Sequence, residues 1–178
     1  MSLADVGTFT RRLDDLGVTV SEGRPDECAE LVNAAAGSPA VGVPLDVPAA
    51  SLPDRVDVAP TAEDLRAAHT GVTGASLAIA EYGSVAIEAD ADGTEPVSLF
   101  VDRHVVVVHA DDLVVDMPDA FAWLGPRARD DGTDVVFATG PSATADMGGL
   151  VHGAHGPKSV HVVLLRDGDD RTDGDADA

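Results

Sequence analysis

The sequence predicts a single α/β domain, in which helices cover both faces of one open sheet. Its 178 residues suit one domain, and a hydrophobic content of 44% is enough to build a buried core. Along the chain, short apolar runs typical of strands alternate with segments of helical periodicity. The run Val105–Val108 is continuous and β-branched, which is typical of a strand buried on both faces of a sheet.

Helices and short strands alternate through the first half of the chain. Phe9, Leu13 and Leu16 share one helical face. Thr61 and Asp64, three residues apart, form a helix-capping pattern. In order, we expect a helix over residues 3–16, a strand over 18–20, a helix from Pro25 to Ala36, strands over 40–43 and 55–58, and a helix that begins at Thr61.

The second half of the chain is richer in strands. We expect strands over residues 75–80 and 84–88 joined by a hairpin turn, a loop over 90–96, a strand over 105–108, a helix over 116–129 interrupted near Pro126, and strands over 134–138 and 160–165. The hairpin indicates an antiparallel excursion from the sheet. Residues 1–166 form the expected domain, and the Asp-rich residues 167–178 form an expected disordered acidic tail.

The charge of the chain excludes two classes of partner. Asp and Glu number 32 against 11 Lys and Arg, which gives a net charge of −21. So much negative charge opposes binding to a nucleic-acid backbone or to an anionic membrane surface. Because the acids are spread along the whole chain, we favour adaptation to a salt-rich, halophilic cytoplasm over an ordinary acidic protein with an acidic tail.

Cys28 is the only cysteine, so the chain can form no internal disulfide and cannot by itself hold a cysteine-ligated iron–sulfur cluster. The sequence does not begin with a basic and apolar leader, and no apolar run reaches the length of a membrane span. We therefore expect a cytoplasmic protein without membrane insertion.

Three polar segments are candidates for a ligand site. The first, Thr139–Asp146, follows an expected buried strand, and open α/β sheets bind ligands beyond the carboxyl ends of their strands. Its backbone N–H groups and hydroxyls would suit an anion such as a carboxylate or a phosphate. Alternatively, Ser142 or Thr144 only caps a helix that follows.

The second segment, Val151–Lys158, is a Gly-rich turn that carries two histidines and the only lysine of the chain. Lys158 could supply a positive charge to an anionic ligand. The spacing of His152, His155 and His161 resembles that of metal ligands. No carboxylate or cysteine lies at motif spacing, so we favour a turn with hydrogen-bonded histidines.

The third segment is the turn Glu81–Ser84, between two expected strands. Glu81 is either a general acid or base held by the turn or a solvated surface carboxylate. His104 and His109, on either side of Val105–Val108, are interpreted as strand-end residues.

These segments, in this order, resemble the lactate utilization protein C family, which is built on the LUD domain. The similarity is clear over residues 60–166 and loose before them. The chain departs from the family pattern at Tyr82, where Thr is common, at Val101, where Pro is common, and at Gly148, where an acid is common. The motif residues are Gly71–Thr73, Ala78–Ser84, Ser98–Leu99, Arg103–Val105, Thr139–Asp146 and Val151–Pro157.

The resemblance implies a fold like that of the glucosamine-phosphate isomerase, ribose-phosphate isomerase and CoA-transferase group. It also implies a part in oxidising lactate to pyruvate beside two partner proteins that carry iron–sulfur clusters, with no cofactor bound by this chain alone and no metal. Glu81 is the candidate catalytic residue. The residues expected to bind a small organic acid are Ser84, Gly140, Pro141, Ser142, Thr144, Asp146, His155 and Gly156, with Lys158 added for its charge.

The sequence leaves three functions open. The first is a non-redox subunit that binds the organic acid or stabilises a lactate-oxidising complex. The second is a stand-alone sugar-phosphate isomerase or acyl/CoA-handling enzyme, with Glu81 as base or nucleophile and the loop at Gly140 as anion hole. The third is a regulatory or structural interaction module. We favour the first, because one cysteine and no cofactor motif fit a system whose redox centres lie in partner proteins.

Overall fold

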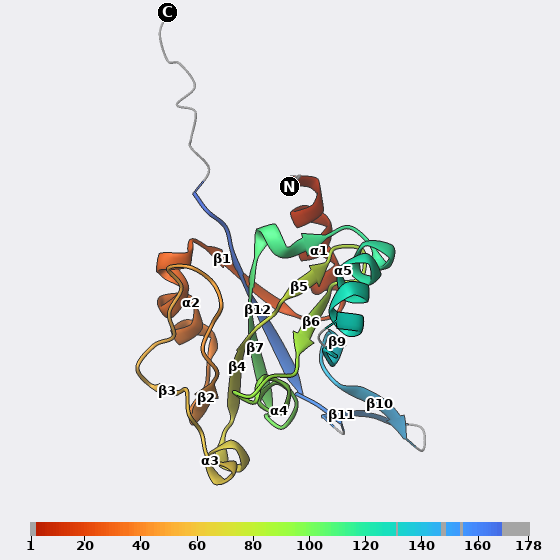
Figure 1. Ribbon diagram of the computed structural model, residues 1–178. Coiled ribbons are helices and arrows are strands. Elements are labelled where there is room, and N and C mark those ends of the chain that lie inside the picture. The colour runs from red at the N-terminus through yellow and green to blue at the C-terminus, as the bar shows by residue number, and fades with distance from the viewer. Residues whose placement is uncertain (1–2, 131, 147–148, 154, 169–178) are drawn as a thin grey trace, which may run out of the picture.

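A six-stranded parallel sheet forms the centre of the computed structural model, which describes residues 3–130, 132–146, 149–153 and 155–168 (Figure 1). Every neighbouring pair of strands in this sheet runs parallel. The predicted α/β class is therefore confirmed. In spatial order the strands are β1 (Thr19–Gly23), β12 (Ser159–Leu165), β7 (Arg103–His109), β4 (Thr70–Gly74), β2 (Ala40–Gly42) and β3 (Val56–Asp57).

Helices cover both faces of this sheet. The helices are α1 (Leu3–Asp15), α2 (Cys28–Ala35), α3 (Ala62–Ala67), α4 (Thr94–Leu99) and α5 (Met117–Asp130), with the 3-10 turns η1 (Pro25–Glu27) and η2 (Ala110–Asp112). On one face α2 buries Cys28 and Val32. On the other face α1 buries Phe9 and Leu13, and Val97 of α4 packs on β2. Figure 1 shows α1 and α2 on opposite sides of the sheet.

A second sheet packs between α1 and α5. Its strands, in order, are β8 (Leu113–Val114), β5 (Leu77–Ile79), β6 (Ser84–Glu88) and β9 (Val135–Thr139). Ala78 and Val85 face the core beneath α1, whereas Ile79 and Ala86 pack against Ala120 of α5. Because β5 and β6 are antiparallel, the predicted antiparallel hairpin is confirmed.

Local sequence rules account for several elements. Val105, Val106, Val107 and Val108 are all fully buried, as the continuous β-branched run predicts. At the start of α3, the Thr61 N–H donates to Asp64 Oδ2 (2.9 Å), and the Asp64 N–H donates to Thr61 Oγ1 (3.3 Å). This reciprocal pair is the capping arrangement expected from the sequence.

The strand β4 and the helix α4 are among the elements that were not predicted. The strand β4 contains Gly71 and Gly74 and has no long apolar run, so its sequence is a weak strand signal. A Cβ at Gly71 would lie 2.2 Å from the carbonyl oxygen of Val97, so the absence of a side chain lets α4 pack closely on β4. The loop expected over residues 90–96 gives way to α4, where the Thr94 N–H donates to Asp90 Oδ1 (3.0 Å).

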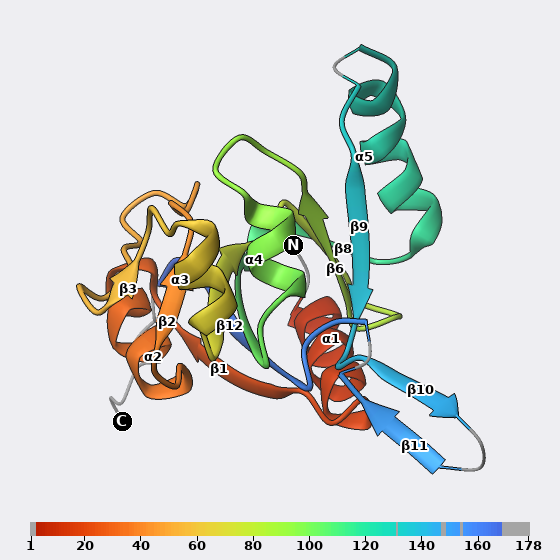
Figure 2. The ribbon, with the colours of Figure 1, turned by 90° about the horizontal axis from the view of Figure 1, so that it is seen from below.

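The region around residues 126–146 also differs from expectation. Helix α5 continues through Pro126 instead of being interrupted there. The strand expected over 134–138 is present as β9, but it is only half-buried and belongs to the second sheet. Next comes an antiparallel hairpin of β10 (Ala143–Asp146) and β11 (Gly149–His152), which projects from the body in Figure 2. Because a strand and not a helix follows Ser142, neither Ser142 nor Thr144 caps a helix. Residues 169–178 of the expected acidic tail lie outside the described residues.

Candidate ligand-binding site

Parts of all three polar segments meet at a cavity of about 360 Å³ between the two sheets. The segments 140–143 and 155–157 form one side, and Gly83 of the hairpin turn and Leu13 of α1 border it as well. His104 and Val160, at the amino ends of β7 and β12, form its floor. The cavity therefore lies near the amino ends of the parallel strands. The strand before Thr139 was expected to belong to the parallel sheet, but β9 belongs to the other sheet, so the segment that follows it does not lie beyond the carboxyl ends of the parallel strands.

The lining of this cavity is mostly apolar. Among the described lining residues there is no Asp, Glu, Lys or Arg, although the chain contains 32 acids. A singly charged organic acid would meet no carboxylate in direct contact, whereas a doubly charged phosphate would find no cation to balance it. The polar side chains of the lining are Ser98, His104, Thr139, Ser142 and His155.

His104 is the most deeply buried polar group of the lining, with 2% of its surface exposed. Its Nε2 lies 2.8 Å from the hydroxyl oxygen of Thr73 on β4. Burial lowers the pKa of His104 to about 4, because the charged imidazolium loses its hydration. The ring is therefore neutral at physiological pH. The sequence analysis took His104 for a strand-end residue; its place at the amino end of a continuous buried valine run was the available signal.

Ser142 joins the two glycine-rich segments. Its N–H donates to the Pro157 carbonyl (2.9 Å), and its own carbonyl accepts from the Gly153 N–H (2.9 Å). The His155 N–H donates to Ser142 Oγ (3.3 Å). Gly140 has a φ of +67°, and a Cβ there would lie 3.2 Å from Cβ of Leu16, so glycine suits this bend beside α1. These contacts place the expected residues Gly140, Pro141, Ser142, His155 and Gly156 at one wall of the cavity.

Ser84 and Glu81 have different positions. Ser84 is buried, and its Oγ lies 2.6 Å from Oγ1 of Thr139, so it joins β6 to β9; it is not itself a lining residue, although Thr139 is. Glu81 is exposed at the hairpin turn and does not line the cavity. Its backbone N–H donates to the Val115 carbonyl (3.0 Å).

Lys158 contacts a carboxylate of the chain itself. Its Nζ lies 2.7 Å from Oδ1 of Asp102, and its N–H donates to the Asp102 carbonyl (2.8 Å). The hydrogen bond and charge of Lys158 lower the pKa of Asp102. The lysine stem packs against Gly153, where a Cβ would lie 2.4 Å from Lys158 Cγ. Lys158 thus holds the turn against the start of β7, and it is not among the lining residues.

The two remaining expected ligand residues, Thr144 and Asp146, lie on β10. Their backbones pair with Val151 and Gly149 of β11. The side chains of Thr144 and Asp146 lie outside the described part of the structure, and Ala143 is the last residue of this segment among the described lining residues.

Of the histidines considered as metal ligands, the side chain of His152 lies outside the described part of the structure, and neither His155 nor His161 belongs to a group of metal-ligating side chains among the described residues. His161 lies on the α2 side of the sheet, where its Nδ1 is 2.7 Å from Thr19 Oγ1 and its Nε2 is 2.9 Å from Ser21 Oγ. Burial and the nearby Arg103 lower the pKa of His161 to about 4. Both ring nitrogens are occupied by hydroxyls, as expected of a structural histidine.

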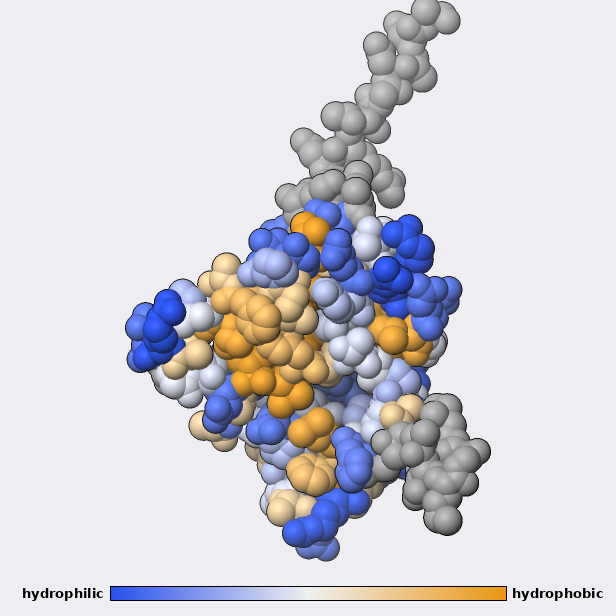
Figure 3. Space-filling model, turned by 90° about the vertical axis from the view of Figure 1, so that its right-hand side faces the viewer, coloured by the Kyte–Doolittle hydropathy of each residue, from blue (hydrophilic) through white to orange (hydrophobic). Residues whose placement is uncertain are grey.

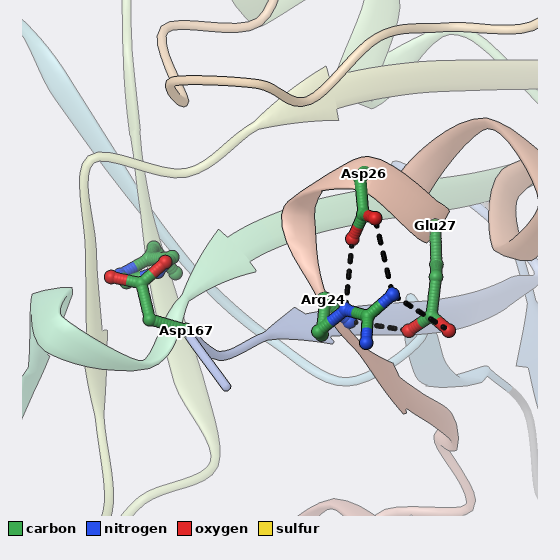
Figure 4. Close-up of polar contacts among 5 residues, drawn as sticks. Arg24, Asp26, Glu27 and Asp167 are labelled. Atoms are coloured by element: carbon green, nitrogen blue, oxygen red, sulfur yellow. Dashed lines mark hydrogen bonds and ion pairs between the residues drawn. The ribbon is translucent and has the colours of Figure 1, made fainter. Parts of the chain in front are cut away.

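A group of acids and one histidine lies at the opposite edge of the sheet. His109 Nε2 is 3.7 Å from Asp167 Oδ1, and Asp111 is beside the same ring. The His109 Nδ1 already accepts the Asp111 N–H (3.3 Å), and both carboxylates are exposed. Arg24 forms ion pairs with Asp26 and Glu27, and Figure 4 shows that this cluster is separate from Asp167. This group therefore has no coordination geometry that we assign to a metal.

A second cavity, of about 450 Å³, lies beyond the carboxyl ends of β2 and β4. Its lining includes Asp46, Glu88, Asp90 and Asp112, with Arg127 as its described basic residue. Burial raises the pKa of Asp112; the charge of His109 opposes this shift, and the nearby charges of Asp111 and Asp46 add to it. An organic anion would be repelled here, which leaves the cavity between the sheets as the better candidate.

The LUD domain family model matches residues 31–165, which is most of the chain. This chain belongs to the LUD domain family. The proposed resemblance is confirmed, and the domain includes the whole lining of the cavity from Gly83 onward.

Three curated relatives of this LUD domain carry the same name. A protein from Deinococcus radiodurans named lactate utilization protein C is 29% identical over 165 residues, covering 88% of this chain and 77% of the relative. Proteins of the same name from Oceanobacillus iheyensis and Bacillus licheniformis are 28% and 31% identical over 106 residues. Those two matches cover 55% and 56% of this chain and 44% and 43% of the relatives, so this LUD domain spans less than half of either.

A solved structure shares the fold of this LUD domain. It is the crystal structure of a DUF162 family protein from Deinococcus radiodurans, with a TM-score of 0.73 and 24% sequence identity. The alignment covers 93% of this chain and 99% of that one. Among the described residues of the LUD domain, no helix is both long and apolar enough to cross a bilayer.

Proposed function

We propose that this LUD domain is a subunit of a lactate-utilization system and binds a small organic acid in the cavity between its sheets. The family carries the first part of the proposal, because the relatives named above are lactate utilization proteins C. The absence of acids among the described lining residues supports the second part. In a chain with a net charge of −21, such a lining is the least repulsive place for a carboxylate.

Iron–sulfur partner proteins carry out the oxidation of lactate to pyruvate in this proposal. The chain itself offers one cysteine, Cys28, which is fully buried under the sheet. Burial raises the pKa of Cys28 to about 11, so it stays a protonated thiol and a poor metal ligand. The redox centre is therefore assigned to partners, and this chain to ligand binding.

The α5 face suits association with such partners. Figure 3 shows a broad hydrophobic area on this side of the molecule. Phe121 on α5 is 59% exposed, and Val115 just before α5 is 43% exposed. Large exposed apolar areas commonly mark protein–protein contacts.

A stand-alone sugar-phosphate or CoA-handling enzyme is the weaker alternative. Its substrates carry phosphate groups, and the described lining has no Lys or Arg to balance them. Its expected base, Glu81, is exposed outside the lining.

The test is a pull-down of the tagged full-length chain from lactate-grown host cells in high salt, followed by mass spectrometry. Recovery of cysteine-rich iron–sulfur proteins with the wild type supports the subunit proposal. Phe121→Asp should reduce that recovery, whereas Phe100→Asp, at a side chain 73% exposed elsewhere, should not. A wild-type chain that is recovered alone contradicts the proposal.

A further inference from the structure

We propose that His104 donates a hydrogen bond from Nδ1 to the acid bound in the cavity, as a neutral imidazole whose tautomer is fixed by Thr73. The inference rests on the proposed function, because it assigns the recognition group of that same cavity. The ligand class it implies is a small monocarboxylate with a short apolar end, such as a 2-hydroxy or 2-oxo acid.

Strand register places His104 and Thr73 on the cavity side of the sheet. His104 is paired with Gly71 on β4 and with Val160 on β12, and Val160 belongs to the core beneath α1. Thr73, two residues beyond Gly71, has its side chain on the same face. Because Gly71 has no side chain, the imidazole can lie over β4 and reach the Thr73 hydroxyl, 2.8 Å away.

The hydrogen-bond pattern fixes which nitrogen carries the proton. Within the described structure, His104 is the hydrogen-bond partner found for the Thr73 hydroxyl, which is fully buried. A buried hydroxyl that did not donate would leave its proton unpaired, so Thr73 donates to Nε2. A neutral ring that accepts at Nε2 carries its hydrogen at Nδ1.

The Nδ1–H is available to a ligand. No described residue makes a hydrogen bond to it, although only 2% of the residue's surface is exposed and the ring lines the cavity. Around it, Val106, Val160 and Val162 supply apolar surface, and the Ser98 hydroxyl already donates to the Glu95 carbonyl (2.7 Å). A carboxylate or keto oxygen would satisfy the donor while an apolar end packs on the valines.

Two substitutions at His104 test the roles of its two ring nitrogens one at a time. The amide of Asn lies close to the position of Nδ1, and the amide of Gln lies close to the position of Nε2. His104→Asn therefore keeps a donor toward the cavity and loses the Thr73 contact. His104→Gln keeps the Thr73 contact and loses the cavity donor. His161→Gln is the matched control, because His161 is equally a buried histidine of the same sheet but contacts Thr19 and Ser21 on the opposite face.

The measurement is isothermal titration of the purified full-length chain with L-lactate and with pyruvate in molar KCl. We expect His104→Gln to weaken binding about 10- to 100-fold, because a hydrogen bond to a charged group is lost. His104→Asn and His161→Gln should bind within a few-fold of wild type. Nitrogen-15 NMR of the free protein should show Nδ1 as the protonated nitrogen of His104, with a signal that shifts on addition of the acid.

The outcomes distinguish this inference from the function on which it rests. A wild-type chain that binds neither acid contradicts the ligand-binding part of the proposed function together with the inference. Wild-type binding that is unchanged in His104→Gln, or a ring protonated at Nε2, overturns the inference alone. Equal weakening by both His104 variants, matched by equal losses of stability, assigns His104 a structural role instead.

Discussion

Replacement of Gly71 by Ala should destabilise the fold through one contact. The new Cβ would lie 2.2 Å from the Val97 carbonyl oxygen, well inside the 3.4 Å at which ordinary contact begins. Side chains of Val97 and Val101 also lie 3.1 Å from that position. A backbone oxygen cannot rotate away as a flexible side chain can, so α4 must move away from β4.

The size of the effect follows from two opposing terms. Overpacking by one methyl group costs about 1–3 kcal/mol, and contact with backbone places this site near the upper end. Replacing glycine also lowers the conformational entropy of the unfolded chain, which stabilises the folded state by about 0.4–1 kcal/mol. The net loss is about 2 kcal/mol, which lowers Tm by about 4–8 °C in a protein of this size.

Gly74→Ala is the matched control, because it lies on the same strand and its nearest neighbour, Leu45 Cδ2, would be 3.8 Å from the new Cβ. Thermal unfolding followed by circular dichroism in molar KCl should give Gly74→Ala a Tm equal to or slightly above wild type. If Gly71→Ala has the same Tm as the wild type, or if both variants lower Tm by the same amount, close packing of α4 on β4 is not the reason for glycine at position 71.

Three further predictions concern charge. With a net charge of −21, Tm should rise between dilute buffer and molar KCl as repulsion is screened; a flat series of melts contradicts the expected salt adaptation. The folded pKa of His104 is about 4 against about 6.5 unfolded, so its contribution to stability is complete above pH 6.5 and is lost as pH falls toward 4, by about 3 kcal/mol. Urea unfolding at pH 7 and pH 4.5 should show this loss in wild type and a smaller one in His104→Gln; equal losses refute it. Lys158→Met should change stability by less than about 1 kcal/mol and leave lactate affinity unchanged, because Lys158 and Asp102 form an exposed pair outside the lining; a large loss of affinity by calorimetry would restore Lys158 to the site.

Elements that obey local rules were predictable from the sequence. The buried run Val105–Val108, the helix that places Phe9 and Leu13 inward, and the reciprocal cap of Thr61 and Asp64 each depend on residues that are near one another in the chain. The resemblance to the LUD domain also identified the segments around Ser142 and His155, which hydrogen bonds now join.

What the sequence missed depends on contacts between distant segments. β4 is a strand because it pairs with β2 and β7, and Gly71 lets α4 pack over it; nothing within Thr70–Gly74 records these contacts. Pro126 is tolerated inside α5 because this part of the helix is exposed, so water can satisfy the carbonyl that proline leaves without a donor. His104 lines a cavity only because the paired strands β6 and β9 pack across from β7. The residues that pair between β6 and β9 are about 50 positions apart in the chain.

Charge and cavity are connected through ionic strength. In dilute salt the field of a −21 protein extends over a Debye length of about 30 Å, so the whole molecule repels an organic anion. In molar salt that length falls to about 3 Å, and only charges in direct contact with the ligand still matter. A lining without Asp or Glu among its described residues then no longer opposes the binding that we propose, and a neutral donor such as His104 is expected to serve there in place of a lysine. The acid-lined cavity at the carboxyl edge stays repulsive at any salt concentration, because its carboxylates would contact the ligand. The affinity for lactate should therefore rise with KCl, together with Tm but for a separate reason.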